Sequence, residues 1–195
     1  LEKLQMTPKK PLDLKPWNVF LDKFKNPKHR IKIGLVGKYV ELQDSYKSIL
    51  ESLIHAGAVN ETEIEVVSIH SEHLEEGNVA KQLDGLHGLI VAPGFGERGI
   101  EGKISAIAHA RARKLPFFGI CLGMQMAVIE YARNHVGIPK ANSTEMDTDC
   151  HEAVIDLMES QKSIVKKGGT MRLGAWDCEL QAESKAAAAY QKKTV

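Results

Sequence analysis

Apolar and polar positions along the chain follow two different periods. Short apolar runs, typical of buried strands, lie at 31–37, 63–69, 86–91 and 117–120. Apolar residues three and four positions apart predict amphipathic helices at 44–57 and 100–114. Strands that alternate with helices of this length are typical of parallel βαβ units. The expected fold is therefore α/β, with an open, mostly parallel sheet and helices on both faces.

Both helices carry terminal signals. Asp44 is expected to cap the first helix, and Gly57 to end it. The second helix presents its apolar face through Ile100, Ile104, Ile107 and Ala108. The basic run 111–114 at its end would complement the helix dipole, and a solvated terminus explains it.

The two ends of the chain differ from this middle part. Residues 1–30 hold four of the seven prolines and are expected to form a linker, with one short helix at 17–24 whose aromatic residues pack on a neighbour. Residues 31–195 are expected to form the domain proper. Its pattern weakens after Asn142, with a strand predicted at 153–158 and a turn or lid at Gly168–Gly169. Because the chain begins with Leu1, we expect it to be a piece of a longer protein.

The amino-acid composition argues against several classes of function. The net charge is +1, from 26 basic and 25 acidic residues, so no overall field favours nucleic acid or a membrane surface. No apolar stretch reaches membrane-spanning length, and the N-terminus lacks the form of a signal peptide. Three cysteines make a disulfide framework improbable and favour a reducing cytoplasm.

The strongest chemical signal is the segment Gly119-Ile120-Cys121-Leu122-Gly123, which joins a predicted strand to a predicted helix. Gly-x-Cys-x-Gly is the cysteine form of the nucleophile elbow, a sharp turn that exposes its central side chain. A thiol at a helix N-terminus is favoured as the thiolate. The alternative is a small packed cysteine between two glycines. The nearly all-apolar helix expected at 124–133 favours the elbow, because the helix behind an elbow lies in the core.

Other motifs fail in their context. The segment Gly94–Gly99 matches Gly-x-Gly-x-x-Gly, but no acidic residue follows at the spacing that a dinucleotide's ribose requires. Such a loop beside an elbow is better suited to present N–H groups to an oxyanion. His70, His73 and the pair Cys150-His151 lack further ligands at metal spacing, so no metal site is expected. No P-loop is present. A cysteine nucleophile needs a base, and no histidine of the chain stands out for that task.

Taken together, the motifs resemble the class I glutamine amidotransferases, a flavodoxin-like fold. Within them the chain is similar to the glutaminase domains of the CTP synthase family. The resemblance covers roughly residues 31–180, and residues 1–30 look like the linker from an N-terminal synthetase domain. The segments that carry it are Ile33–Tyr39, Asp44–Ser48, Pro93–Gly99, Phe118–Gln125, Asn142–Glu145 and Gly168–Gly174.

The resemblance implies that Cys121 attacks the side-chain amide of glutamine, releases ammonia and forms a thioester that water cleaves. It implies an oxyanion hole from the N–H groups of Gly94 and Leu122. Arg172 falls in the family's lid, a candidate for the effector GTP. Residues that would contact glutamine are Gly94, Leu122, Gly123, Met124, Gln125 and Glu145, the last suited by charge to the α-ammonium.

The resemblance also implies the wider reaction. The ammonia would aminate UTP to CTP with ATP and Mg²⁺ in the synthetase domain, within a homo-oligomer, expected to be a tetramer; the glutaminase domain itself needs no cofactor. An amidotransferase domain that serves GMP or carbamoyl-phosphate synthesis, and a non-catalytic α/β module, remain alternatives. The family's His-Pro-Glu lies downstream of Val195, so the chain as written is expected to hydrolyse glutamine poorly or not at all.

Overall fold

The computed structural model of the chain describes residues 3, 5, 12–158 and 175–195. The chain falls into two compact units, Leu1–Asp156 and Leu157–Val195. The helices of the first unit are α1 (Lys15–Lys25), η2 (Gln43–Tyr46), α2 (Lys47–Val59), η3 (Ser71–His73), α3 (Val79–Gln82), α4 (Ile100–Ala112), α5 (Leu122–Tyr131) and the π-turn η4 (Ala132–Val136). Its strands are β1 (His29–Gly37), β2 (Thr62–His70), β3 (Gly88–Val91), β4 (Phe117–Gly119), β5 (Asn142–Ser143) and β6 (Ala153–Ile155).

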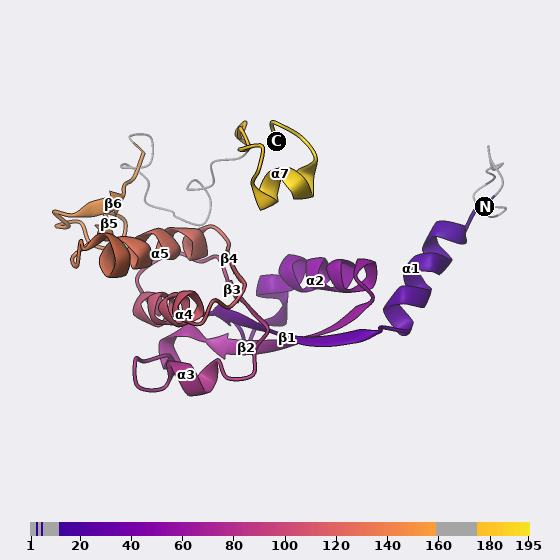
Figure 1. Cartoon of the computed structure of the whole chain (residues 1–195), viewed down its shortest axis with the longest axis horizontal. Coiled ribbons are helices and arrows are strands. Elements are labelled where there is room, and N and C mark those ends of the chain that lie inside the picture. Colours follow the sequence, from indigo (N-terminus) through magenta and orange to yellow (C-terminus); the bar gives the residue numbers. More distant parts are fainter. Residues whose placement is uncertain (1–2, 4, 6–11, 159–174) are drawn as a thin grey trace. The chain divides into compact units, whose positions relative to one another are not determined.

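The first four strands form one parallel sheet in the order β2-β1-β3-β4 (Figure 1). The central strand β1 pairs along its whole length with β2 and pairs with β3 through Ile33–Val36. Each crossover contains a helix, as parallel neighbours require. The predicted open parallel α/β sheet is confirmed.

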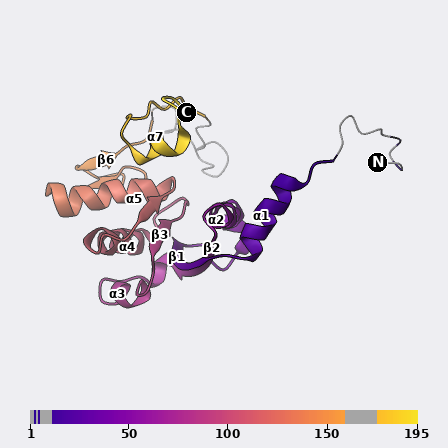
Figure 2. The ribbon, with the colours of Figure 1, turned by 45° about the vertical axis from the view of Figure 1, so that its right-hand side comes forward.

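Helices cover both faces of this sheet, which is also as predicted (Figure 2). Successive residues of a strand point to opposite faces, so Leu35 packs with Ile49 and Leu50 of α2, while Val36 packs with residues of α4 and α5. The face under α4 and α5 holds the larger core. Its fully buried residues include Val91, Met126 and Ile129.

The first predicted helix is wrong at both ends. Asp44 lies within the short turn η2 and does not cap α2, whose N-terminal flank Tyr46 makes no side-chain capping bond. The turn instead places the buried Tyr46 ring against Gly37, where a Cβ would lie 2.4 Å from the tyrosine Oη. Nor does Gly57 end the helix, which continues to Val59. A Cβ at Gly57 would lie 2.6 Å from the Thr62 carbonyl oxygen, so the glycine permits close packing of α2 on β2.

Two predictions of burial near the elbow are also wrong in part. The run before Cys121 was expected to be a buried strand, but among the described strands β4 is at the edge of the sheet, and Phe118 is 63 % exposed. The following helix begins at Leu122 rather than Met124, and only one face of it is buried; Met124 and Val128 are exposed. The apolar composition of these two segments therefore predicted more burial of their side chains than the structure has.

The helix predicted at 17–24 is present as α1. Its Phe20 ring meets His55 of α2 edge-on at 6.1 Å between centroids and stacks on Trp17 and Phe24. The strand predicted at 153–158 is shorter, pairing as β6 with β5. In the second unit Ser184 caps α7 (Lys185–Tyr190), and an antiparallel bridge joins Glu179 to Thr194. Gly168–Gly169 lie outside the described residues. No helix among the described residues is long and apolar enough to cross a membrane.

Candidate active site

The candidate site lies at the carboxyl ends of the parallel strands, where open α/β sheets bind ligands. Lys38 follows β1, the segment Ala92–Gly94 follows β3, and Cys121 follows β4. Backbone hydrogen bonds fix these segments to one another: Ala92 N–H donates to the Val36 carbonyl (2.9 Å), and Ile120 N–H donates to the Val91 carbonyl (3.0 Å). The sheet thereby brings the predicted nucleophile and the predicted oxyanion loop to the same edge.

Cys121 has the backbone of a sharp strand-to-helix turn. Its φ is 53° and its ψ is −110°, a backbone conformation that residues other than glycine rarely adopt. The carbonyl of Cys121 accepts hydrogen bonds from Met124 and Gln125 N–H, which starts α5 directly behind it. The thiol is free and exposed at the N-terminus of that helix, where the dipole favours negative charge.

The two flanking glycines allow backbones to touch at this turn. A Cβ at Gly119 would lie 2.6 Å from the Gly123 carbonyl carbon, and one at Gly123 would lie 2.1 Å from the Val91 carbonyl oxygen. Either distance is a collision with backbone, so neither position accepts a side chain without movement of the turn. The Gly-x-Cys-x-Gly pattern is therefore a steric requirement of this geometry.

Gly94 and Leu122, the predicted oxyanion donors, lie close together. A Cβ at Gly94 would lie 3.7 Å from Leu122 Cδ2. Within the described residues, neither N–H group donates a backbone hydrogen bond, and Leu122 is the first residue of α5, whose N–H groups have no partner inside the helix. Both N–H groups are thus available to an acceptor near Cys121.

Two lysines under this loop were not identified from the sequence. Lys103 of α4 is fully buried, and its Nζ donates to the Ala92 carbonyl (3.0 Å). Lys38 is 6 % exposed, and its Nζ donates to the Phe95 carbonyl. A signal for Lys103 existed: it lies three residues after Ile100 and four before Ile107, on the face of the helix that was predicted to be buried. A charged residue there is unusual.

The other residues expected to contact glutamine are spread over two elements. Gly123 is buried, Met124 is exposed, and Gln125 is half-buried, all on the first turn of α5. Glu145 is half-buried after the short strand β5, and its N–H donates to Ser143 Oγ (3.2 Å). Its neighbour Met146 packs in the same core cluster as Leu122 and Met126. Arg172 lies outside the described residues, so its predicted role in a lid stays a prediction.

No histidine is linked to the thiol among the described residues. The rings of His70 and His73 stack on each other at 4.6 Å, and His70 Nδ1 accepts from Glu72 N–H. No group of three or more histidine, cysteine, aspartate or glutamate residues in the described part of the chain could hold a metal ion. The described residues therefore place the predicted nucleophile beside the predicted oxyanion donors, and none of them is a visible base for Cys121.

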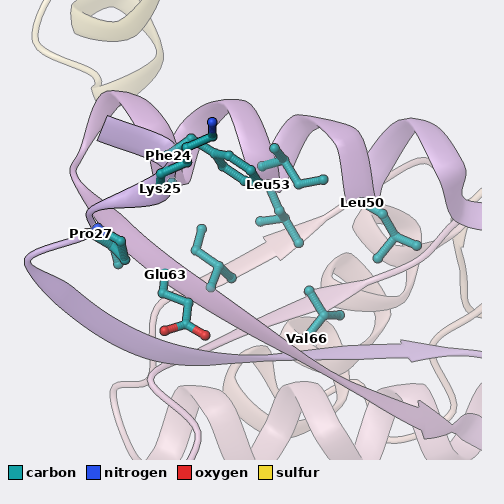
Figure 3. A pocket seen from close by; sticks show the side chains of 11 residues that line it. Phe24, Lys25, Pro27, Leu50, Leu53, Glu63 and Val66 are labelled. Carbon is teal, nitrogen blue, oxygen red and sulfur yellow. The ribbon is translucent and has the colours of Figure 1, made fainter. Parts of the chain in front are cut away.

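A well-formed pocket of the first unit lies away from Cys121. It is an open groove of about 740 Å³ between α1, α2 and β2, lined mainly by apolar side chains such as Phe24, Leu50 and Leu53 (Figure 3). Its β2 residues, 62–64 and 66, lie in the first half of that strand, whereas Cys121 follows the end of a parallel strand. None of the predicted site residues lines it.

Comparisons with known proteins show the family of the chain. Residues 41–194 match the family model described as glutamine amidotransferase class-I. A CTP synthase of Flavobacterium psychrophilum is 64 % identical over 180 residues, which are 92 % of this chain and 34 % of that protein. A CTP synthase of Flavobacterium johnsoniae is 58 % identical over 195 residues, which are 100 % of this chain and 36 % of that protein.

A solved structure has the same fold. The glutaminase domain of Trypanosoma brucei CTPS with bound acivicin superposes with a TM-score of 0.75 at 35 % identity. The match covers 84 % of this chain and 64 % of that one. Against the two Flavobacterium relatives, by contrast, the chain spans only about a third of the length of the protein it matches.

Proposed function

The chain belongs to the class I glutamine amidotransferase family, and on this premise we propose that it hydrolyses the side-chain amide of glutamine through a thioester on Cys121. One observation carries the proposal: an exposed thiol lies in a strained turn at a helix N-terminus, beside two N–H groups that have no backbone partner among the described residues. This arrangement suits attack on an uncharged carbonyl that becomes an oxyanion.

The proposed reaction has two steps. The Cys121 thiolate adds to the amide carbon of glutamine, and the oxyanion accepts hydrogen bonds from Gly94 and Leu122 N–H. Collapse of this adduct breaks the C–N bond, and the nitrogen leaves as ammonia after it takes a proton. Water then attacks the γ-glutamyl thioester, giving glutamate and the free thiol. Gln125 and Glu145 hold the amino acid end of glutamine, with the Glu145 carboxylate next to the α-ammonium.

The base that activates this water is proposed to come from a segment outside the described residues. The family resemblance assigns that base to a His-Pro-Glu segment downstream of this chain, and the relatives are about three times as long. Loss of a general base lowers turnover by about 10²–10⁴-fold, and it bears most on the step in which water cleaves the thioester.

We further propose that the ammonia aminates UTP to CTP, as the names of the relatives at 50–64 % identity suggest. In the longer protein, a synthetase domain would use ATP and Mg²⁺, GTP would activate the glutaminase through the segment of Arg172, and the enzyme would act as a cytoplasmic homo-oligomer. Service of another acceptor, or a non-catalytic module, receives no support from these relatives.

Acivicin tests the first step on the chain itself. We expect one covalent addition by intact mass, located by peptide mapping at Cys121, slowed by an excess of glutamine and absent from Cys121→Ala. Iodoacetamide, which needs no amino acid site, serves as the control for general thiol reactivity and should also modify Cys178. Addition of acivicin at Cys178 or Cys150 with the same rate constant would contradict a glutamine site at Cys121.

A further inference from the structure

The oxyanion loop rests on two buried ammonium groups. Lys103 Nζ donates to the carbonyl of Ala92, and Lys38 Nζ donates to the carbonyl of Phe95. These two carbonyls lie two residues before and one residue after Gly94. The loop around the candidate oxyanion donor is therefore held on both sides by lysine side chains, one from α4 and one from the end of β1.

Both lysines also lie close to Gly94 itself. A Cβ at Gly94 would lie 3.7 Å from Lys103 Nζ and 3.3 Å from Lys38 Cε. In the described part of the chain, no carboxylate forms an ion pair with either ammonium. Two positively charged side chains thus lie beside Gly94, and no carboxylate among the described residues pairs with them. Lys103 is also shielded from water, because it is fully buried.

Such a pair is costly to a folded protein. Burial lowers the pKa of Lys103 to about 8, the nearby charge of Lys38 lowers it too, and the negative charge of a Cys121 thiolate raises it. Packing alone would favour an apolar residue at position 103, because the other residues of that helix face are isoleucines and alanines. A buried ammonium at this position, close enough to interact electrostatically with Cys121, indicates that Lys103 has a role in the candidate active site.

We propose that Lys103 and Lys38 are positioning residues of the oxyanion hole. They hold the carbonyls of Ala92 and Phe95 so that Gly94 N–H faces the reacting carbonyl, and their charges stabilise the oxyanion as it forms. This inference rests on the proposed function, since the oxyanion exists only if Cys121 is acylated. In water-excluded sites, a fixed positive charge near a developing oxyanion acts at nearly full strength.

The test compares two reactions of the same thiol. With the γ-(4-nitrophenyl) ester of glutamate, the thiolate adds to the ester carbon, an oxyanion forms, and 4-nitrophenolate leaves as the C–O bond breaks and the C–S bond persists. The coloured burst reports one acylation per thiol and requires no deacylation. With iodoacetamide, the thiolate displaces iodide from a saturated carbon, so the C–S bond forms as the C–I bond breaks and no oxyanion appears. Because both reactions need the thiolate, the ratio of their rate constants cancels any change in thiolate fraction.

We expect Lys103→Met to lower this ratio by about 100-fold, the usual effect of removing one element of an oxyanion site. Lys103→Gln keeps a donor for the Ala92 carbonyl but not the charge, and should lose about 10-fold. Lys38→Met should lower the ratio in the same direction. Lys81→Met, an exposed lysine on α3, is the matched control and should leave it unchanged.

The outcomes separate the two proposals. If wild type gives a burst and the Lys103 and Lys38 variants keep its ratio within about twofold, this inference is wrong while the proposed function stands. If wild type is alkylated but gives no burst, the proposed function fails, and the inference fails with it. Should Lys103→Met not fold, as judged by circular dichroism, Lys103→Gln and Lys38→Met decide the matter.

Discussion

Arg111 and Glu130 join α4 to α5 through a two-pronged ion pair. Arg111 Nη2 lies 2.8 Å from Glu130 Oε1, and Arg111 Nε lies 3.0 Å from Oε2. The Glu130 side chain is 1 % exposed, whereas that of Arg111 is 40 % exposed. The pair connects the helix that carries Lys103 to the helix that begins behind Cys121. The expectation that the basic end of α4 is merely solvated is wrong at Arg111.

Loss of Arg111 should destabilise the fold. Burial raises the pKa of Glu130, but hydrogen bonds from Arg111 and Asn134 outweigh it and hold the pKa below its usual value. Arg111→Met leaves this carboxylate buried without its cation, and we expect a loss of about 3 kcal/mol in the free energy of unfolding at pH 7. Urea unfolding measures it. Because the pKa is lowered, the stabilisation should disappear as pH falls below about 4.5, where wild type and variant should converge.

An exposed ion pair provides the control for this experiment. Arg30 and Glu63 lie 3.3 Å apart across β1 and β2, and both side chains are more than half exposed. Arg30→Met should cost less than about 1 kcal/mol. An equal loss of unfolding free energy in the two variants would mean that burial of Glu130 does not make its ion pair more important to stability.

The sequence predicted the strands and the elbow better than it predicted their surroundings. The apolar runs that became β1 and β2 and the pattern around Cys121 are local signals, because strand period and glycine sterics act within a few residues. Exposure of Phe118 is not local: it depends on β4 lying at the sheet edge. The pairing of Arg111 with Glu130 and the placement of Lys103 under Ala92 likewise depend on how α4 docks. Spacing along one helix cannot specify such contacts.

The glycines of the elbow should not tolerate a methyl group. In Gly123→Ala the new Cβ would meet the Val91 carbonyl oxygen, a backbone atom that cannot turn aside, and we expect destabilisation of about 3 kcal/mol or more. Gly77→Ala is the control, since nothing lies within 4 Å of its Cβ position. Thermal unfolding compares the two. Equal tolerance of both substitutions would contradict the close contact of the elbow with β3.

Relief of the strain at Cys121 should stabilise the fold at the expense of its chemistry. Cys121→Gly accepts φ 53° and ψ −110° without a Cβ penalty, so we expect a gain of about 1 kcal/mol in the free energy of unfolding. Cys121→Ala removes the same thiol but keeps the Cβ, and should gain nothing. Both variants abolish thioester formation. If Ala stabilised as much as Gly, the thiol rather than the backbone would be the source of the effect.

Glu145 should act in binding rather than in chemistry. Under the proposed function, Glu145→Gln removes a charge pairing that would be made equally with bound glutamine and with the transition state, so the KM for glutamine should rise by about 10–100-fold with little change in kcat. Steady-state glutaminase assays separate the two constants. Asp147→Asn, an exposed carboxylate two residues away, is the control. A fall in kcat alone would mean that Glu145 orients the reacting groups.

The buried charge of Lys103 should make stability depend on alkaline pH. Its pKa in the folded chain is about 8, below the ordinary 10.5, so between these values the unfolded chain binds more protons than the folded one. Stability contributed by position 103 must therefore rise as pH increases from about 8 to about 10.5, by up to about 3 kcal/mol. Other ionisable groups of the chain also release protons at alkaline pH. The measured quantity is hence the difference in unfolding free energy between wild type and Lys103→Met.

At pH 7 this difference should be small, because Met removes the desolvation of the ammonium but leaves the Ala92 carbonyl without its donor, a loss of about 1–3 kcal/mol. Near pH 10 a neutral amine still bonds that carbonyl without a buried charge, so wild type should be the more stable protein by about 2 kcal/mol. Urea unfolding at the two pH values decides. A difference that stays constant with pH would show that Lys103 keeps its ordinary pKa, and that its charge costs the folded chain nothing.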